Sequence, residues 1–279
     1  MKRLFLLLAQ SLLLLALLVF VFPLGPSRDA RAQTLTVDFF DVGKADAALI
    51  TTPHGSRILI DAATNKEGKA LAKRLVQAGI ERIDVMIITH YDKDHVGGAD
   101  QILEELSVGQ VIMPVYEKES KQYSQFLDAL AESPQTQTVP MNARSERSFT
   151  LDGAALRITA AHQTDYGKDE ENDFSLAVRM TYGKTRFLFP GDAEDARQRE
   201  LLLEGDVACD VLKAPYHGRL VAASQDFLTA ASPQIAFIPD SDEDAASETV
   251  VSILSALGCR VHSARDGDLR VTSDGESVW

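Results

Sequence analysis

The chain has 279 residues, of which 45% are hydrophobic and 25% are charged, and this ordinary composition predicts a packed globular body. Residues 1–32 carry four basic residues and one acidic residue, so the remainder has a formal net charge of −16. Such a charge disfavours tight, non-specific binding of nucleic acid, because it repels phosphates unless a local basic groove or metal ions compensate.

The first 32 residues have the pattern of a secretory signal peptide. A short basic start is followed by an apolar run from Leu4 to Phe22, a Pro/Gly breaker at 23–26 and an Ala-Arg-Ala sequence that ends at Ala32. The apolar run is nearly long enough to span a bilayer, so an uncleaved N-terminal anchor is the alternative. Both readings place the body outside the cytoplasm, secreted or membrane-anchored, and the membrane is a partner only if the segment is retained.

Short strands then alternate with amphipathic helices. In chain order, we expect strands at Leu35–Phe40, Ala47–Thr51 and Arg57–Ile60, a helix at Gly68–Ala78, a strand at Val85–Ile88, a helix at Ala99–Leu106, a strand at Val111–Met113 and a helix at Gln122–Ala131. Residues 134–147 are polar and predict a surface loop.

The second half has the same character. The expected elements are strands at Leu156–Ala160, Leu176–Thr181 and Arg186–Phe189, a helix at Ala193–Leu203, a strand at Val207–Lys213, a helix at Gln225–Ala230, a strand at Ile235–Ile238, a helix at Glu248–Leu257, and strands at Arg260–His262 and Leu269–Thr272. Strands followed by alternating helices in each half indicate two packed sheets with helices outside. Because no Pro- or Gly-rich linker separates the halves, we expect one domain over residues 33–279.

The most informative segment follows the apolar strand Val85–Ile88. It reads His90-Tyr91-Asp92-Lys93-Asp94-His95-Val96-Gly97-Gly98, with four acid or imidazole ligands within six residues. Imidazole and carboxylate groups together suit zinc, manganese or iron, and the two glycines allow a tight turn or a close backbone approach. The two cysteines, Cys209 and Cys259, cannot form a four-cysteine zinc site, so a metal site here must use His and Asp. They could form a disulfide in an oxidising compartment, although two buried, unpaired thiols are the favoured reading.

Other apolar strands also end in Asp or His. Asp192 follows Gly191 at a strand end, where it could otherwise be a helix N-cap, and His217 lies in a glycine-containing turn. Asp46 and Asp61 follow two of the first strands. Each signal is weak by itself, but several such strand ends in one chain indicate a shared site. His162 is a weaker candidate ligand, and the acidic run from Asp240 to Asp244 lacks the glycine and spacing of a calcium loop.

In their order, these motifs resemble those of the metallo-β-lactamase superfamily. Within it, the chain is similar to the ComEC-like hydrolases, which share the extracytoplasmic hydrolase domain of the ComEC DNA-uptake protein. The motifs are Asp41-Val42-Gly43-x-x-Asp46-Ala47, Ile60-Asp61, Thr89-His90-x-Asp92-x-Asp94-His95-x-Gly97-Gly98, Asn172-x-x-Ser175-Leu176, Gly191-Asp192, Leu212-Lys213-x-Pro215-x-His217-Gly218 and Asp266-Gly267.

The resemblance implies an α/β fold, an αββα sandwich of two packed mixed sheets with helices outside and a metal site at one edge between the sheets. It implies metal ligands at His90, Asp92, Asp94, His95, Asp192 and His217. By this analogy His90 and Asp92 would serve one ion and Asp94 and His95 the other. Asp192 would bridge the two ions and His217 would complete one shell. The implied cofactor is one or two divalent ions, zinc or manganese, and the carboxylates favour manganese.

The chain departs from the ComEC-like pattern in three places. Lys44 and Ala45 stand where these proteins usually carry Gln and Gly, and Tyr216 and Arg219 replace the His and Ser of a His-His-Gly-Ser motif. Residues 240–244 are acidic where relatives are rich in Gly, His and Pro. By the same resemblance, these changed residues would line the substrate side.

The leading functional hypothesis is an exported metal-dependent hydrolase of phosphodiester bonds that uses a metal-activated water, with Asp94 as the catalytic residue that orients this water. Its substrate would be a small molecule or a polymer, and nucleic acid is a candidate that the acidic charge disfavours. One alternative is a hydrolase of cell-envelope esters, lactones or phosphorylcholine-type groups. The other is a non-catalytic envelope-binding module that retains a structural metal.

Overall fold

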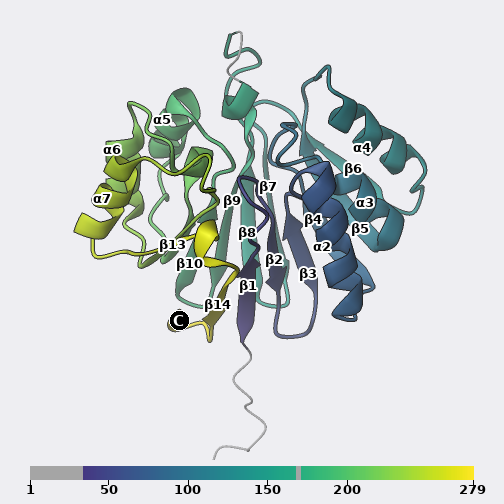
Figure 1. Cartoon of the computed structure of the whole chain (residues 1–279), viewed down its shortest axis with the longest axis horizontal. Helices are drawn as coiled ribbons and strands as arrows, with labels where there is room; N and C mark the ends of the chain where they lie inside the picture. Colours follow the sequence, from purple (N-terminus) through teal and green to yellow (C-terminus); the bar gives the residue numbers. More distant parts are fainter. Residues whose placement is uncertain (1–33, 168–170) are drawn as a thin grey trace, which may run out of the picture. The chain divides into compact units, whose positions relative to one another are not determined.

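Two seven-stranded mixed sheets lie face to face in the computed structural model, and helices cover the outer face of each sheet (Figure 1). The structure describes residues 34–167 and 171–279, and the stretch from Thr34 to Trp279 forms one compact unit. The predicted αββα sandwich is therefore confirmed. The signal peptide or anchor predicted for residues 1–32 lies outside the described residues. Within the described ranges, no helix has both the length and the apolar character needed to cross a membrane.

The first sheet has the strand order β14-β1-β2-β3-β4-β5-β6. Its strands are β1 (Leu35–Phe39), β2 (Ala48–Thr51), β3 (Arg57–Ile60), β4 (Arg82–Ile87), β5 (Ser107–Pro114), β6 (Gln137–Met141) and β14 (Leu269–Ser273). The strands from β14 to β3 pair antiparallel, and those from β3 to β6 pair parallel. Helices α2 (Asn65–Gln77), α3 (Ala99–Glu105) and α4 (Lys121–Ala131) cover the outer face, where a buried apolar cluster joins them to the sheet.

The second sheet mirrors this plan in the order β13-β12-β11-β10-β9-β8-β7. Its strands are β7 (Glu146–Leu151), β8 (Ala154–Thr159), β9 (Ala177–Tyr182), β10 (Thr185–Phe189), β11 (Val211–Lys213), β12 (Ile235–Ile238) and β13 (Arg260–Ser263). Strands β7 to β10 pair antiparallel, and β10 to β13 pair parallel. Helices α5 (Asp195–Glu204), α6 (Ser224–Ala231) and α7 (Glu248–Ala256) cover it. Three short 3₁₀ helices, η1 (Glu171–Phe174), η2 (Pro215–Gly218) and η3 (Ala264–Asp266), lie in the connections.

The core between the sheets is apolar and draws on both of them. Phe39 of β1 stacks on Phe237 of β12 and Phe189 of β10, with ring centroids 5.0 and 5.8 Å apart. This packing fixes the two sheets against each other. Because the carboxyl ends of parallel strands open into loops at one edge of a sheet, the loops after β3, β4, β10 and β11 are placed to form a shared site.

The prediction of a surface loop for residues 134–147 is wrong. This segment contains β6, which pairs in parallel with β5 and buries Val139 and Met141 in the core between the sheets. The segment has a polar sequence because β6 is an edge strand whose exposed residues face solvent. It also contains Pro140, which a strand tolerates at a sheet edge. The other predicted elements agree in type, with shifted ends, and β11 is shorter than predicted.

Candidate metal centre

Four chain segments meet at one edge of the sandwich and bring four buried side chains together. Asp46 precedes β2, His95 lies in the loop after β4, Asp192 follows β10 and His217 follows β11. One ligand atom from each of these residues lies within 4.8 Å of the others. Backbone hydrogen bonds hold the segments in place: Asp46 N donates to Asp94 O at 3.0 Å, and Ala62 N donates to His95 O at 2.8 Å. Residues separated by up to 171 positions (from 46 to 217) thus form one local group, which we call the four-residue cluster.

Two histidines of the four-residue cluster have their ring orientation fixed by the protein. His217 Nδ1 donates to the carbonyl oxygen of Pro239 at 2.9 Å, and a carbonyl can only accept, so Nδ1 carries the proton. His95 Nδ1 lies 2.8 Å from Asp61 Oδ2. In each neutral imidazole, the Nε2 lone pair is then left to face the four-residue cluster. A hydrogen-bonded Nδ1 of this kind is the usual support for a histidine that binds a metal through Nε2.

His90 lies beside the four-residue cluster, and its ring orientation is also fixed through Nδ1. The hydroxyl of Thr89 donates to Asp61 Oδ2 at 2.8 Å, so its oxygen can accept from His90 Nδ1, 3.1 Å away. The rings of His90 and His95 are 4.1 Å apart between centroids. Burial lowers the pKa of His90 to about 4, with a further contribution from His95, so His90 is neutral at neutral pH.

The site contains polar atoms that the protein leaves unpaired. Nε2 of His90, His95 and His217 and Oδ1 of Asp46 are buried without a hydrogen-bond partner among the described residues. His217 Nε2 and His95 Nε2 also lie 2.8 and 3.3 Å from Asp192 Oδ2, and these contacts are ion pairs only while the imidazoles carry a proton. An unsatisfied buried polar atom costs about 1–3 kcal/mol, so several in one place need an explanation. Imidazole Nε2 atoms beside carboxylates fit a divalent metal, and the residues present therefore suit the group.

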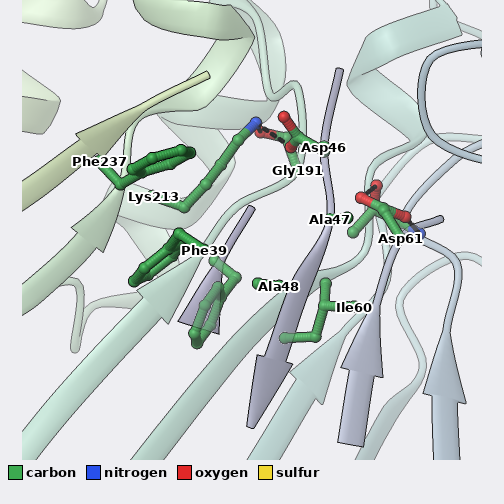
Figure 2. A pocket seen from close by; sticks show the side chains of 11 residues that line it. Phe39, Asp46, Ala47, Ala48, Ile60, Asp61, Gly191, Lys213 and Phe237 are labelled. Carbon is green, nitrogen blue, oxygen red and sulfur yellow. Dashed lines mark hydrogen bonds and ion pairs between the residues drawn. The ribbon is translucent and has the colours of Figure 1, made fainter. Parts of the chain in front are cut away.

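Lys213 places a positive charge beside the same carboxylates. Its Nζ contacts Asp46 Oδ2, lies 2.9 Å from Asp192 Oδ1 and donates to the carbonyl oxygen of Gly191 at 2.9 Å. Figure 2 shows the side chain extending from β11 with its nitrogen at Asp46 and Gly191, beside a small cavity that the rings of Phe39 and Phe237 also line. The lysine is buried, and it keeps its proton because the two carboxylates raise its pKa despite the burial.

Without a metal, the four-residue cluster is a set of coupled charges. Burial opposes the charged form of each histidine, but the surrounding carboxylates, Asp192 first, raise the pKa of His217 to about 9 and that of His95 well above its usual value. Burial likewise opposes ionisation of Asp192, yet His217 and Lys213 hold its pKa well below the usual range. Protons on the histidines thus stand in for some of the positive charge that a metal would supply.

The six predicted metal ligands do not all lie together in the structure. His95, Asp192 and His217 belong to the four-residue cluster, whereas His90 and Asp94 lie against it, Asp94 Oδ2 being 3.5 Å from His217 Nε2. Asp92 instead pairs with Lys118, which also pairs with Glu171. Whether these side chains bind a metal stays a prediction.

Two functional residues were not assigned a role from the sequence. Asp46 is a member of the four-residue cluster, and Asp61 accepts from Thr89 N, Thr89 Oγ1 and His95 Nδ1. Their sequence signal was present, since both are acids at the ends of apolar strands, but no local feature distinguished a ligand from a supporting residue.

The glycines after the ligand loop are required by packing. A Cβ on Gly98 would lie 2.3 Å from Ala62 O and 2.4 Å from Gly68 Cα, so the start of α3 touches α2 through backbone alone.

The backbone at the His217 ligand position is strained, since Tyr216 and His217 both have positive φ, at 48° and 50°. Such a conformation is costly for non-glycine residues and is found where surrounding structure holds a functional side chain in position.

The weaker candidates have structural roles or lie elsewhere. His162 Nε2 lies 3.1 Å from Glu204 Oε1, and Ser175 Oγ accepts from Asp192 N at 3.0 Å. Asp240 is buried and accepts from Ala246 N at 3.0 Å. In the described part of the chain both cysteines are buried, free thiols, as favoured from the sequence.

The sequence model of the metallo-beta-lactamase superfamily matches residues 40–239. The chain belongs to this superfamily. That span contains every residue of the four-residue cluster, and it supports the prediction that the protein is a metal-dependent hydrolase with a divalent metal site.

Three curated relatives support the ComEC-like assignment within the superfamily. The chain is 25% identical over 228 residues to ComE operon protein 3 of Bacillus subtilis, and 27% identical over 209 residues to Recombination protein 2 of Haemophilus influenzae. It is also 24% identical over 205 residues to Competence protein ComA of Neisseria gonorrhoeae. The alignments cover 72–74% of this chain but only 24–28% of the relatives, so the chain corresponds to about a quarter of each of them.

Solved structures share the fold at low sequence identity. Unliganded yeast PDE1 aligns with a TM-score of 0.55 and 11% identity, covering 85% of this chain and 99% of that one. CmlA, a diiron β-hydroxylase from Streptomyces venezuelae, aligns with a TM-score of 0.53 and 15% identity, covering 86% of this chain and 54% of that one. These similarities establish the fold of the chain. The chemistry is inferred from the residues of the site.

Proposed function

We propose that the protein is an exported hydrolase that cleaves phosphodiester bonds with the help of a divalent metal. The observation that carries the proposal is the group of buried histidine Nε2 atoms that have no hydrogen-bond partner among the described residues and face the carboxylates of Asp46 and Asp192. Buried polar atoms without partners are rare unless a ligand satisfies them. Export rests on the signal-like residues 1–32 and remains part of the proposal.

The residues of the site divide into ligands and supports. His95, His217, Asp192 and Asp46 would hold a divalent ion, with His90 as a further neutral imidazole next to them. Asp61 and the carbonyl of Pro239 keep the two cluster histidines turned with Nε2 inward. When bound, the ion would lower the pKa of a water molecule and offset negative charge on an attacked phosphoryl group.

Asp94 is the residue best suited to orient the attacking water. It lies at the edge of the four-residue cluster, with 11% of its side chain exposed, so it reaches both the site and the solvent. Although burial opposes its ionisation, the nearby His217 and His95 hold its pKa well below the usual range. An ionised carboxylate in this position can accept a hydrogen bond from water and direct the oxygen lone pair toward a substrate.

The choice of a phosphodiester rests on the family and on local charge. Two of the curated relatives have names that refer to recombination and to competence, and phosphodiesters are the bonds that link nucleic acids. At the edge of the site, Lys44 Nζ lies 3.4 Å from Asp94 Oδ2, which places a cation where an anionic substrate would approach. The predicted alternative, an ester or lactone of the cell envelope, is favoured by the −16 formal charge of residues 33–279, which opposes long polyanions.

Purified protein incubated with manganese or zinc should hydrolyse bis-p-nitrophenyl phosphate. Plasmid DNA and simple p-nitrophenyl esters, tested in parallel, separate the three substrate classes. His95→Ala should abolish the activity, whereas His54→Ala, which removes an exposed histidine from a turn, should leave it unchanged. Ester hydrolysis without phosphodiester hydrolysis would replace the proposal by its alternative. Absence of both activities in a metal-loaded protein would favour a non-catalytic binding module.

A further inference from the structure

The carboxylate of Asp244 lies between two cations that come from distant parts of the chain. Asp244 Oδ2 is 2.5 Å from Arg219 Nη2 and 3.7 Å from Lys44 Nζ. The side chains of Lys44, Asp244 and Arg219 are 27%, 35% and 40% exposed, so all three are open to solvent. We call these three residues the ion-pair cluster.

The ion-pair cluster adjoins the candidate metal centre directly. Lys44 Nζ lies 3.4 Å from Asp94 Oδ2, and the same oxygen lies 3.5 Å from His217 Nε2. Arg219 is only two residues beyond His217 along the chain. A molecule that touched both Lys44 and Arg219 would therefore lie next to the bond-breaking residues.

The surrounding structure holds the ion-pair cluster in position. The guanidinium carbon of Arg219 stands 5.3 Å from the centroid of the Tyr216 ring. Asp244 N donates to Ser241 Oγ at 3.2 Å, and the same loop is tied down by the buried Asp240, which accepts from Ala246 N at 3.0 Å. Arg219, held over the Tyr216 ring, can bind an anion with little loss of side-chain freedom.

The three residues are among the positions at which, by the resemblance described above, the sequence departs from the ComEC-like pattern. By that resemblance, Lys44 and Arg219 stand where uncharged residues are expected, and Asp244 belongs to an acidic stretch where a Gly-, His- and Pro-rich one is expected. The structure brings these departures, up to 200 positions apart, into one set of ion pairs. They are therefore parts of one feature.

We propose that Lys44 and Arg219 bind a second, non-reacting phosphate group of a small phosphodiester substrate. In the substrate-free protein the Asp244 carboxylate occupies the position of that phosphate, and it moves out of this position when the substrate binds. This inference rests on the proposed phosphodiester hydrolase function. Lysine and arginine are the residues that proteins use for phosphate recognition, and a carboxylate between them has the charge and hydrogen-bonding capacity of a phosphate oxygen.

The balance of charge limits the size of the substrate. Two cations suffice for one additional phosphate, whereas the −16 formal charge of residues 33–279 repels every further phosphate of a long strand. The preferred substrate is thus a short molecule, such as a nucleotide phosphodiester with a terminal phosphate.

The test compares two chromogenic substrates that differ by one phosphate. Thymidine 5′-(p-nitrophenyl phosphate) is used with and without a 3′-phosphate, on the metal-loaded full chain. The wild type should prefer the 3′-phosphorylated substrate in kcat/KM by about tenfold or more, since a hydrogen bond to a charged group has about this value. Lys44→Gln and Arg219→Ser should each reduce the preference through KM, and Asp244→Asn should increase it. Lys66→Gln, at an exposed lysine of α2, is the matched control and should change nothing.

Calorimetry with thymidine 3′,5′-bisphosphate gives a readout that does not need turnover. Binding to the wild type that weakens about tenfold in the Lys44→Gln variant supports the inference even if neither substrate is cleaved, a result that would overturn only the proposed hydrolysis. Cleavage of both substrates at equal rates, or a preference that persists in the double variant, would overturn the inference and leave the proposed function standing. Absence of bisphosphate binding to the wild type would also overturn it.

Discussion

Lys213 Nζ lies 2.9 Å from Asp192 Oδ1, so a buried lysine already neutralises part of the carboxylate charge that faces the histidines. The same ammonium group contacts Asp46. Lys213 therefore links the stability of the site to its occupancy, because a divalent ion and the lysine both compensate the same two carboxylates.

Lys213→Met should destabilise the metal-free protein by about 3–5 kcal/mol, because the substitution leaves buried carboxylates without their partner. A divalent ion supplies the missing charge, so manganese should raise the unfolding temperature more in the variant than in the wild type. Thermal unfolding in EDTA and in manganese measures both effects. Equal responses of the two proteins to manganese would contradict this role for Lys213.

Asp61→Asn should weaken metal binding about 10- to 100-fold, the range seen when a residue that orients a ligand is changed. Asp61 accepts hydrogen bonds from Thr89 and from His95 Nδ1, and an amide cannot accept all of them. Calorimetric titration with manganese gives the affinity. Asp152→Asn, at a carboxylate that accepts from Thr52 Oγ1 in a surface turn, is the control and should bind as the wild type does.

Metal affinity should increase as the pH rises from about 6.5 toward 9. The carboxylates raise the pKa of His217 to about 9 in the metal-free protein, so an ion must displace a proton below that pH. For the metal-free protein the sign is opposite. The folded-state pKa lies above the unfolded value, so the stability that His217 contributes is fully present below pH 6.5 and is lost as the pH rises through 9. Unfolding in EDTA across this range, compared with His217→Gln, would refute the assignment if both proteins respond identically.

Gly98→Ala should cost at least about 1–3 kcal/mol, because the added methyl group would overlap the backbone of Ala62 and Gly68. Urea denaturation measures the loss. Ala70→Gly on the exposed face of α2 is a useful comparison, since it alters helix propensity without touching this contact and should cost about 1 kcal/mol. A Gly98→Ala variant as stable as the wild type would show that α2 and α3 can separate.

Much of the fold follows from strand and helix periodicity, because each sheet buries one face between the sheets and the other beneath helices. The loop prediction for residues 134–147 was wrong for a physical reason. β6 is an edge strand, and three of its five residues are exposed. Its pairing with β5 is a tertiary property that a polar local sequence does not reveal.

The candidate site was predictable as a set of strand ends but not as a geometry. His95, Asp192 and His217, which the resemblance implied as ligands, lie close together, and their binding of a metal stays a prediction. The contact of Asp92 with Lys118 joins residues 26 positions apart through a loop, and no periodicity encodes it. Asp46 was recognisable as part of a motif, yet its place in the four-residue cluster depends on how the turn before β2 folds over the loop after β4.

The metal content of the purified protein tests the central claim most directly. Elemental analysis of the wild type, after incubation with manganese or zinc and removal of free ions, should find at least one divalent ion per chain. His95→Ala and His217→Ala should lose that ion while His54→Ala keeps it. A folded wild type that retains no ion, or a His95→Ala,His217→Ala double variant that retains as much as the wild type, would contradict the account.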